Sequence, residues 1–155
     1  MYHSAIASLA NQASNWLMEK YIPERKGSLH PNIAPYGEMV KTKDNKDIVL
    51  AVGNNTQFRN LCFALGAISL ADNKKFRDNI DRVKNRKKLK RKMDILFRKK
   101  NASEWINIFV DKNIPAGLCR TVNEVLKDNN AAKMLLSYRR NLKTLKCIKT
   151  IAFEI

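Results

Sequence analysis

The sequence predicts an α+β fold in which helices surround a short antiparallel β-hairpin. Two β-forming runs, at 37–42 and 47–53, are separated by a short polar turn at 43–46, which is typical of a hairpin. After residue 54, most apolar residues recur three or four positions apart, which indicates helices. Residues 48–52 are all apolar, so we expect the second strand to be covered on both faces.

The chain before the hairpin is predicted to be one helix followed by a loop. The helix spans 3–19, and nothing in the sequence caps it or precedes it with a polar leader, so we expect the chain to begin inside a larger protein. Segment 23–35 is interrupted by prolines and a glycine, which exclude a continuous helix and favour a linker leading into an ordered loop. The apolar face of the helix consists of Ile6, Leu9, Ala13, Trp16 and Leu17.

Four helices are predicted between the hairpin and residue 128, each from an apolar face or a start signal. A further helix at 130–138 and a final strand at 147–155 complete the predicted elements. The signals for the four helices are Phe58, Leu61, Cys62 and Leu65 between an Asn54-Asn55-Thr56 cap and Gly66; Leu89, Met93, Leu96 and Phe97; Trp105, Ile108 and Phe109 after Asn101; and the capping box of Thr121 and Glu124.

The composition excludes several classes of protein. With 155 residues and 45% hydrophobic residues, the chain can form one domain with a core. It contains no apolar run near the roughly 20 residues that span a bilayer. Its cysteines, Cys62, Cys119 and Cys147, are odd in number and widely spaced, which suits reduced thiols in the cytoplasm and gives no zinc-binding pattern. The formal net charge of +16 favours polyanionic partners without choosing among them.

A series of short segments resembles family III CoA-transferases, the CaiB/BaiF group. The series starts with Leu29-His-Pro-Asn-Ile-Ala-Pro-Tyr36 and continues through Ile48-Val-Leu-Ala-Val-Gly-Asn54. Within the family, the HPNIAPY form is most similar to enzymes that move CoA between dicarboxylates, such as succinate–hydroxymethylglutarate CoA-transferase. Later matches include Asp78-Asn79, Arg82-Val83, Asn85-Arg86, Glu104-Trp105, Ile114-Pro-Ala-Gly117 and Ile151-Ala-Phe153.

The resemblance implies an activity, a fold and partners. Family members transfer CoA from an acyl-CoA to a free acid through covalent intermediates on an aspartate. Each chain has a large Rossmann-like domain and a small α+β domain, and two chains interlock as a homodimer. Because the catalytic aspartate and most CoA contacts belong to the large domain, we expect this chain alone to be inactive and assign it no catalytic residue. Its partners would be the rest of the enzyme and a second subunit.

The same resemblance divides the chain into four parts. Residues 1–20 correspond to a helix from the end of the large domain, and 21–35 to a linker and a loop that faces the active site. Residues 36–128 correspond to the small domain. Residues 129–155 correspond to a helix and strand returning toward the large domain.

The active-site loop gives the only candidate site residues, which are His30, Asn32 and Tyr36. His30 is a candidate hydrogen-bond donor to a substrate carboxylate, although it could equally satisfy carbonyls of the loop itself. Tyr36 has packing as its competing role. The glycine run of formyl-CoA transferase is missing here, and the prolines favour a fixed wall over a moving lid.

Two alternative functions stay open. Segment 84–100 carries ten basic residues and one acid, as a nucleic-acid site would. Against this, the segment keeps an apolar face for burial, which includes its one aromatic residue, Phe97. Aromatic residues that could stack on bases are not interleaved among its charges. Within the family, an α-methylacyl-CoA racemase is the other alternative.

Overall fold

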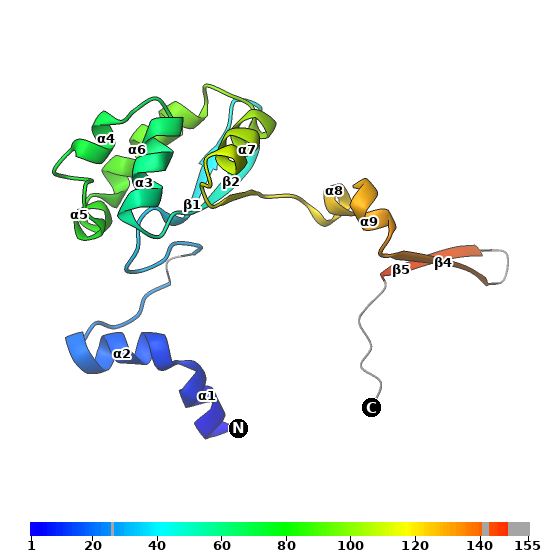
Figure 1. Cartoon of the computed structure of the whole chain (residues 1–155). Helices are drawn as coiled ribbons and strands as arrows, with labels where there is room; N and C mark the ends of the chain where they lie inside the picture. The colour runs from blue at the N-terminus through cyan, green and yellow to red at the C-terminus, as the bar shows by residue number, and fades with distance from the viewer. Residues whose placement is uncertain (26, 141–142, 149–155) are drawn as a thin grey trace.

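Three short strands form the sheet of the central part of the molecule (Figure 1). The computed structural model describes residues 1–25, 27–140 and 143–148. Strands β1 (Tyr36–Lys41), β2 (Asp47–Ala51) and β3 (Ala116–Leu118) are antiparallel, in the order β1-β2-β3. The predicted hairpin is confirmed, with Val40 paired to Ile48, whereas the three-residue β3 was too short to be predicted.

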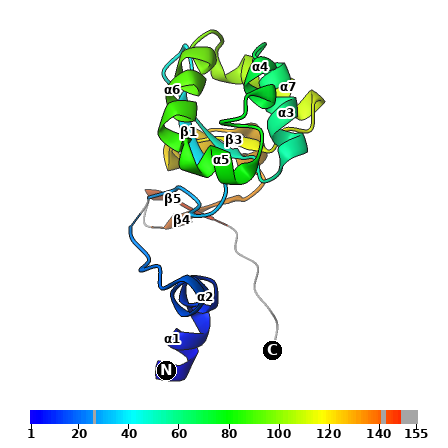
Figure 2. The ribbon, with the colours of Figure 1, turned by 90° about the vertical axis from the view of Figure 1, so that its left-hand side faces the viewer.

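Helices pack against this sheet as the periodic apolar residues predict. Helix α6 lies against β1, and α7 lies against β3 (Figure 2). The predicted start signals are present: the Asn54 side chain accepts a hydrogen bond from the Gln57 amide at 2.8 Å, and the Asn101–Glu104 capping box is formed. The helices of the central part are α3 (Asn55–Ala64), α4 (Ser69–Asp72), α5 (Asn79–Lys84), α6 (Arg86–Phe97) and α7 (Ala102–Asp111).

The hydrophobic core lies between the helices and one face of the sheet. Ile48 and Leu50 of β2 are fully buried, whereas Val49, between them, is only half-buried. The expectation that both faces of this strand are covered is therefore too strong. Trp105 stacks on Phe109 with ring centroids 5.7 Å apart and donates its indole N–H to the Phe97 carbonyl at 2.8 Å. Other buried members of the core are Val40, Phe58, Leu61, Cys62, Leu89, Met93 and Phe97.

The N-terminal segment forms two helices rather than the single helix predicted for 3–19. Helix α1 (Tyr2–Ser8) ends at Leu9, where the backbone leaves helical geometry with φ −82° and ψ 0°, and α2 (Ala10–Glu19) follows directly. The Ser8 hydroxyl donates to the Ala5 carbonyl at 2.7 Å, a local bond that competes with helical ones. The apolar periodicity continues across this break, which explains why the sequence alone did not show it.

The C-terminal segment corrects a second prediction. Helices α8 (Val122–Leu126) and α9 (Asn129–Ala132) are followed by a hairpin of β4 (Leu135–Arg140) and β5 (Lys143–Ile148). The predicted helix at 130–138 is thus wrong from residue 133 onward: α9 ends at Ala132, a turn follows, and from Leu135 pairing with β5 overrides the local helical pattern. The predicted final strand at 147–155 is present at Cys147 and Ile148, and its residues 149–155 lie outside the described part.

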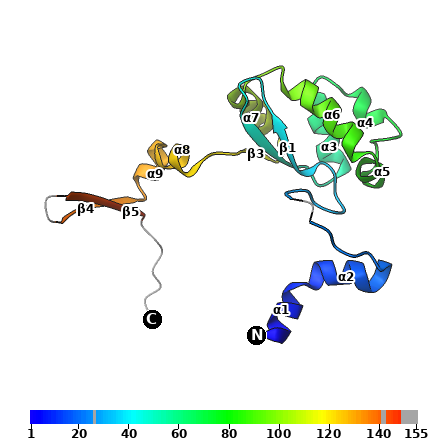
Figure 3. The same ribbon diagram turned by 180° about the vertical axis from the view of Figure 1, so that it is seen from behind.

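The two ends extend away from the central part at separate places (Figures 1 and 3). Helix α1 contributes no buried residue, and neither does α8. The capping box of α8 is nevertheless formed, with the Glu124 amide donating to the Thr121 hydroxyl at 3.3 Å. The core and the candidate site therefore belong to the central part.

Candidate functional site

The segment that leads into β1 forms a closed loop. The His30 amide donates to the Tyr36 carbonyl at 3.0 Å, and the Ser28 hydroxyl donates to the Gly37 carbonyl at 2.7 Å. Gly37 has φ 75°, and a Cβ at this position would lie 1.7 Å from the Ser28 carbonyl oxygen. A side chain is therefore excluded at Gly37, because the two ends of the loop approach each other too closely.

Two of the three predicted site residues contact each other in this loop. The rings of His30 and Tyr36 meet edge to face, with centroids 5.4 Å apart and planes at 71°. The Asn32 amide donates to His30 Nδ1 at 3.2 Å, so Nδ1 is the acceptor and a neutral His30 carries its proton on Nε2. The Asn32 side chain is directed elsewhere, with its amide nitrogen 3.5 Å from the side-chain oxygen of Asn15 in α2.

Side chains from α5 and α6 hold the backbone of this loop. Asn79 accepts from the Ala34 amide at 3.1 Å and donates to the Asn32 carbonyl at 2.8 Å. Arg86 donates to the His30 carbonyl at 2.7 Å and also to the Ile33 carbonyl. The loop is therefore fastened by its peptide groups.

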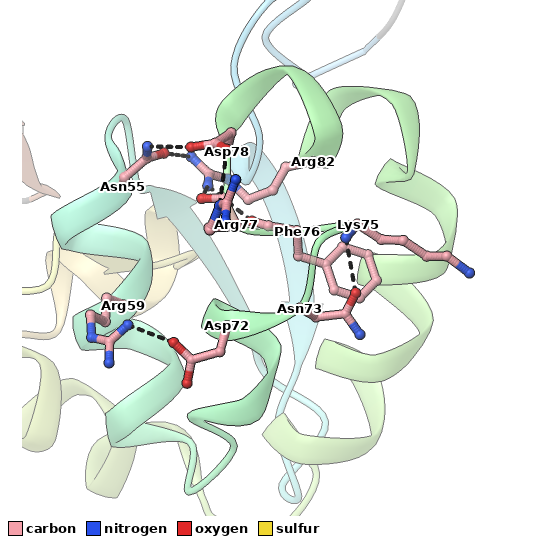
Figure 4. Close-up of polar contacts among 9 residues, drawn as sticks. All are labelled: Asn55, Arg59, Asp72, Asn73, Lys75, Phe76, Arg77, Asp78 and Arg82. Carbon is pink, nitrogen blue, oxygen red and sulfur yellow. Dashed lines mark hydrogen bonds and ion pairs between the residues drawn. The ribbon is translucent and has the colours of Figure 1, made fainter.

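Arg82 is the central residue of this fastening and is fully buried (Figure 4). Its Nε donates to the Ala34 carbonyl at 2.6 Å, and its Nη1 donates to the carbonyls of Phe76 and Arg77 at 3.1 and 2.8 Å. The guanidinium also lies 4.5 Å from the ring centroid of Phe58. No carboxylate of the described residues lies within 4.0 Å of Arg82, so carbonyl dipoles and an aromatic face replace an ion pair. Burial lowers the pKa of Arg82, against the opposing influence of Cys62 and Asp78.

These three fastening residues were quoted in the family resemblance, but their role was missed. A signal for it was available in their spacing, since positions 79, 82 and 86 follow one another at three and four residues. In a continuous helix, three polar side chains at that spacing share one face, whereas here Asn79 and Arg82 belong to α5 and Arg86 begins α6. The neighbouring segment is densely positive and was interpreted as a solvated surface, so the spacing of these residues was overlooked.

Glu38 is a buried acid beside the loop. Its carboxylate lies 3.3 Å from Arg86 Nε, and its side chain is 4% exposed. Burial raises the pKa of Glu38, while the positive charges of Arg86 and Lys90 oppose that rise. Arg86 therefore holds the loop with one nitrogen and neutralises Glu38 with another.

A groove of about 740 Å³ opens next to the loop. Leu29 and Pro31 line it from the loop, and residues of α5 and α6 line it from the other elements. Helix α6 buries Leu89, Met93 and Phe97 as the sequence predicts, so its lysines lie on the opposite, solvated side.

The remaining chemistry of the described residues is limited. No cluster of three or more His, Cys, Asp or Glu side chains suited to a metal ion occurs among residues 1–25, 27–140 and 143–148. No helix in this part of the chain is both long and apolar enough to cross a bilayer. Cys62 and Cys119 are free thiols, and burial raises the pKa of Cys62 to about 12.

Comparison with known proteins gives a consistent result. Residues 1–153 match the sequence profile of CoA-transferase family III. The chain is 36% identical over 122 residues to the succinate–glutarate CoA-transferase of Agrobacterium fabrum, covering 79% of this chain and 30% of the relative. It is 34% identical over 125 residues to the human succinyl-CoA:glutarate CoA-transferase, covering 81% of this chain and 28% of the relative.

A solved structure gives the same match in three dimensions. The CaiB/BaiF family protein of Brucella suis superposes with a TM-score of 0.75 at 31% identity, over 94% of this chain and 38% of that protein. The chain thus spans about a third of the length of the proteins it matches. The α+β arrangement around the small antiparallel sheet agrees with this neighbour.

Proposed function

Because the chain belongs to CoA-transferase family III, we propose that it forms the small-domain part of an enzyme that moves CoA from an acyl-CoA to a free carboxylic acid. The two curated relatives above are named for succinate and glutarate, and both molecules are dicarboxylic acids. We therefore propose a dicarboxylic acid as the acceptor. In this proposal, residues 1–20 and 129–155 contact the rest of the enzyme and a second subunit.

The observation that carries the proposal is the pairing of His30 and Tyr36 on a fastened loop. His30 presents an Nε2 donor and Tyr36 a hydroxyl, and both groups suit an incoming carboxylate. The acid nearest to them in sequence, Glu38, is buried and paired with Arg86, so its charge does not repel an anion at the loop. A loop held in place before binding loses little entropy when the acid arrives. We assign Asn32 a supporting role through its amide contact with His30.

Three of the described aspartates have contacts that suit structural roles rather than that of a nucleophile. Asp44 accepts from the Thr42 hydroxyl at 2.6 Å and from the Ala102 amide at 2.9 Å. Asp47 pairs with Lys41 and Asp72 with Arg59. We therefore place the aspartyl intermediate outside this chain and expect the chain by itself to be inactive.

An exchange assay tests this proposal in two steps. The 155-residue chain is incubated with succinyl-CoA and free glutarate, and we expect no formation of glutaryl-CoA above background. The DNA on both sides of the reading frame is then sequenced, and any longer protein that contains this chain is assayed in the same way. We expect that protein to exchange CoA. Exchange by the 155-residue chain, or epimerisation of an α-methylacyl-CoA without transfer by the longer protein, would contradict the proposal.

The two histidines of the chain supply a matched pair of variants in the longer protein. His30→Ala should raise KM for the acid about tenfold while leaving kcat nearly unchanged, because it removes a binding contact. His3→Ala, on exposed α1, should leave both constants unchanged. Equal changes in KM from the two substitutions would contradict a contact between His30 and the acid.

A further inference from the structure

The groove beside the loop combines an apolar wall with a cluster of cations. Leu29 and Pro31 face it from the loop, and Val83 lies at the end of α5. The cations that line it include Lys84, Lys87, Lys88 and Arg91. Its volume of about 740 Å³ falls within the usual range of small-molecule sites, roughly 300–1,000 Å³.

These four cations have no acidic partners within the described part of the chain. All four are exposed, and no described carboxylate lies within 4.0 Å of any of them. Among the nearby acids, Glu38 pairs with Arg86 and Asp94 pairs with Lys90, while Asp81, three positions before Lys84, forms no ion pair with a described residue. Like charges three or four positions apart on a helix repel one another, so a bound anion would reduce the repulsion among these cations.

The lining residues indicate the kind of anion. An inorganic ion would gain nothing from Leu29, Pro31 and Val83, whereas an organic molecule would bury apolar surface against them. A nucleic-acid strand usually stacks its bases on aromatic side chains, and none of the described residues that line this groove is aromatic. We propose that the groove binds a small organic molecule that carries two or more phosphate groups.

The position of the groove places such a ligand next to the fastened loop. Arg86 lines the groove and also donates to the His30 carbonyl at 2.7 Å. CoA and free nucleotides such as ATP both present several phosphates on an organic body, so either source fits the groove. The inference stands on the groove itself and does not require that the protein transfer CoA.

Isothermal titration of the 155-residue chain tests the site with three probes: CoA, ATP and a single-stranded oligonucleotide. The groove variant carries Lys84→Gln, Lys87→Gln and Arg91→Gln. The matched control carries Lys92→Gln, Arg98→Gln and Lys99→Gln, three exposed residues of the same basic segment that do not line the groove. Both variants lose two lysines and one arginine, so their net charges are equal. Circular dichroism verifies that both remain folded.

We expect the groove variant to weaken binding of CoA or ATP by at least about tenfold near physiological salt, and the control to weaken it less than about twofold. Binding of CoA but not ATP identifies CoA as the source, and the reverse identifies a nucleotide. The proposal would be wrong if both variants lost affinity equally, or if the chain bound neither CoA nor ATP. It would also be wrong if the oligonucleotide bound more tightly than CoA and ATP and the groove variant weakened that binding. Absence of CoA exchange by the longer protein would refute the proposed function and leave this result standing.

Discussion

The central part of the chain, residues 28–118, and its two ends both contain apolar residues at helical spacing, but these residues differ in burial. In the central part, apolar side chains at helical spacing are buried, as Phe58, Leu61 and Trp105 show. In the two ends the same spacing leaves them exposed, with Trp16 at 45% and Leu17 at 65% exposure. Local signals form helices in both regions, but burial occurs in only one.

This difference shows which contacts the chain makes within itself. Other large apolar side chains are exposed in the ends, and surfaces of this kind usually contact protein. If the proposed function is right, the rest of the enzyme or a second subunit covers them. They include Ile6, Leu9, Ile22, Val122, Val125, Met134 and Leu136. Pairs of substitutions, one in each region, test this difference in burial.

The largest difference is expected between two thiols, Cys62 in the core and Cys119 at the start of the C-terminal segment. With a pKa of about 12, Cys62 is almost wholly protonated at pH 8, and burial also blocks access to it. We expect Cys62 to be alkylated on the order of a thousandfold more slowly than exposed Cys119. Peptide mass mapping of a time course measures both rates, and comparable rates would mean that the core opens readily.

The raised pKa of Cys62 also predicts a dependence of stability on pH. In the unfolded chain this thiol ionises near its ordinary value of about 8.5, whereas in the folded chain it stays protonated until about pH 12. The folded state therefore binds more protons between these values. Its free energy of unfolding should fall as pH rises through that window.

The second pair consists of the two tryptophans of the chain. Trp105→Ala should reduce the free energy of unfolding by about 3–5 kcal/mol, because it leaves a cavity against Phe97 and Phe109. Trp16→Ala should change it by less than about 0.5 kcal/mol. Urea unfolding followed by circular dichroism measures both variants. A large loss from Trp16→Ala would show that α2 packs on the central part.

The third pair compares arginines. Arg82→Met should cost about 3 kcal/mol, because the buried carbonyls of Ala34 and Phe76 would lose their donor, as would the part-buried carbonyl of Arg77. Arg98→Met removes an equal charge at an exposed site and should cost less than about 0.5 kcal/mol. The same urea titration distinguishes them, and similar costs would mean that Arg82 is dispensable to the fold.

The smallest pair compares two helix caps. Asn54→Ala removes the cap of α3, which packs in the core, and should cost about 1 kcal/mol of global stability. Thr121→Ala removes the corresponding bond at α8, which has no buried residue. Its effect should be confined to local fraying, seen as faster amide hydrogen exchange in α8 with an unchanged urea midpoint. A shifted midpoint would place α8 within the cooperative unit.

The comparison also explains how much of the fold the sequence predicts. Periodicity located α3, α6 and α7 because each has one apolar face, and α3 and α7 also have a start signal. Turn chemistry located the first hairpin. The break at Leu9 was missed because an apolar repeat continues across it. The strand β4 was read as a helix although its partner β5 begins only three residues after it ends, because Asn141-Leu142 is not one of the dipeptides typical of a two-residue hairpin.

The candidate site was predictable only in part. The family resemblance drew attention to His30, Asn32 and Tyr36, and the structure brings His30 and Tyr36 into contact. Nothing local to the loop shows that Asn79, Arg82 and Arg86 hold it, since these contacts span 45–56 residues. A buried arginine without a carboxylate partner is also not expected from the sequence, because most arginine side chains lie at the protein surface.

The way in which the loop is fastened has a consequence for how its specificity can change. Asn79, Arg82 and Arg86 bind its peptide carbonyls and one peptide amide, and these groups exist whatever side chains the loop carries. Substitutions at positions 30, 32 and 33 can therefore accumulate without releasing the backbone. If the proposed function is right, mutation can change the acceptor preference of such a loop while the residues that hold its backbone stay the same.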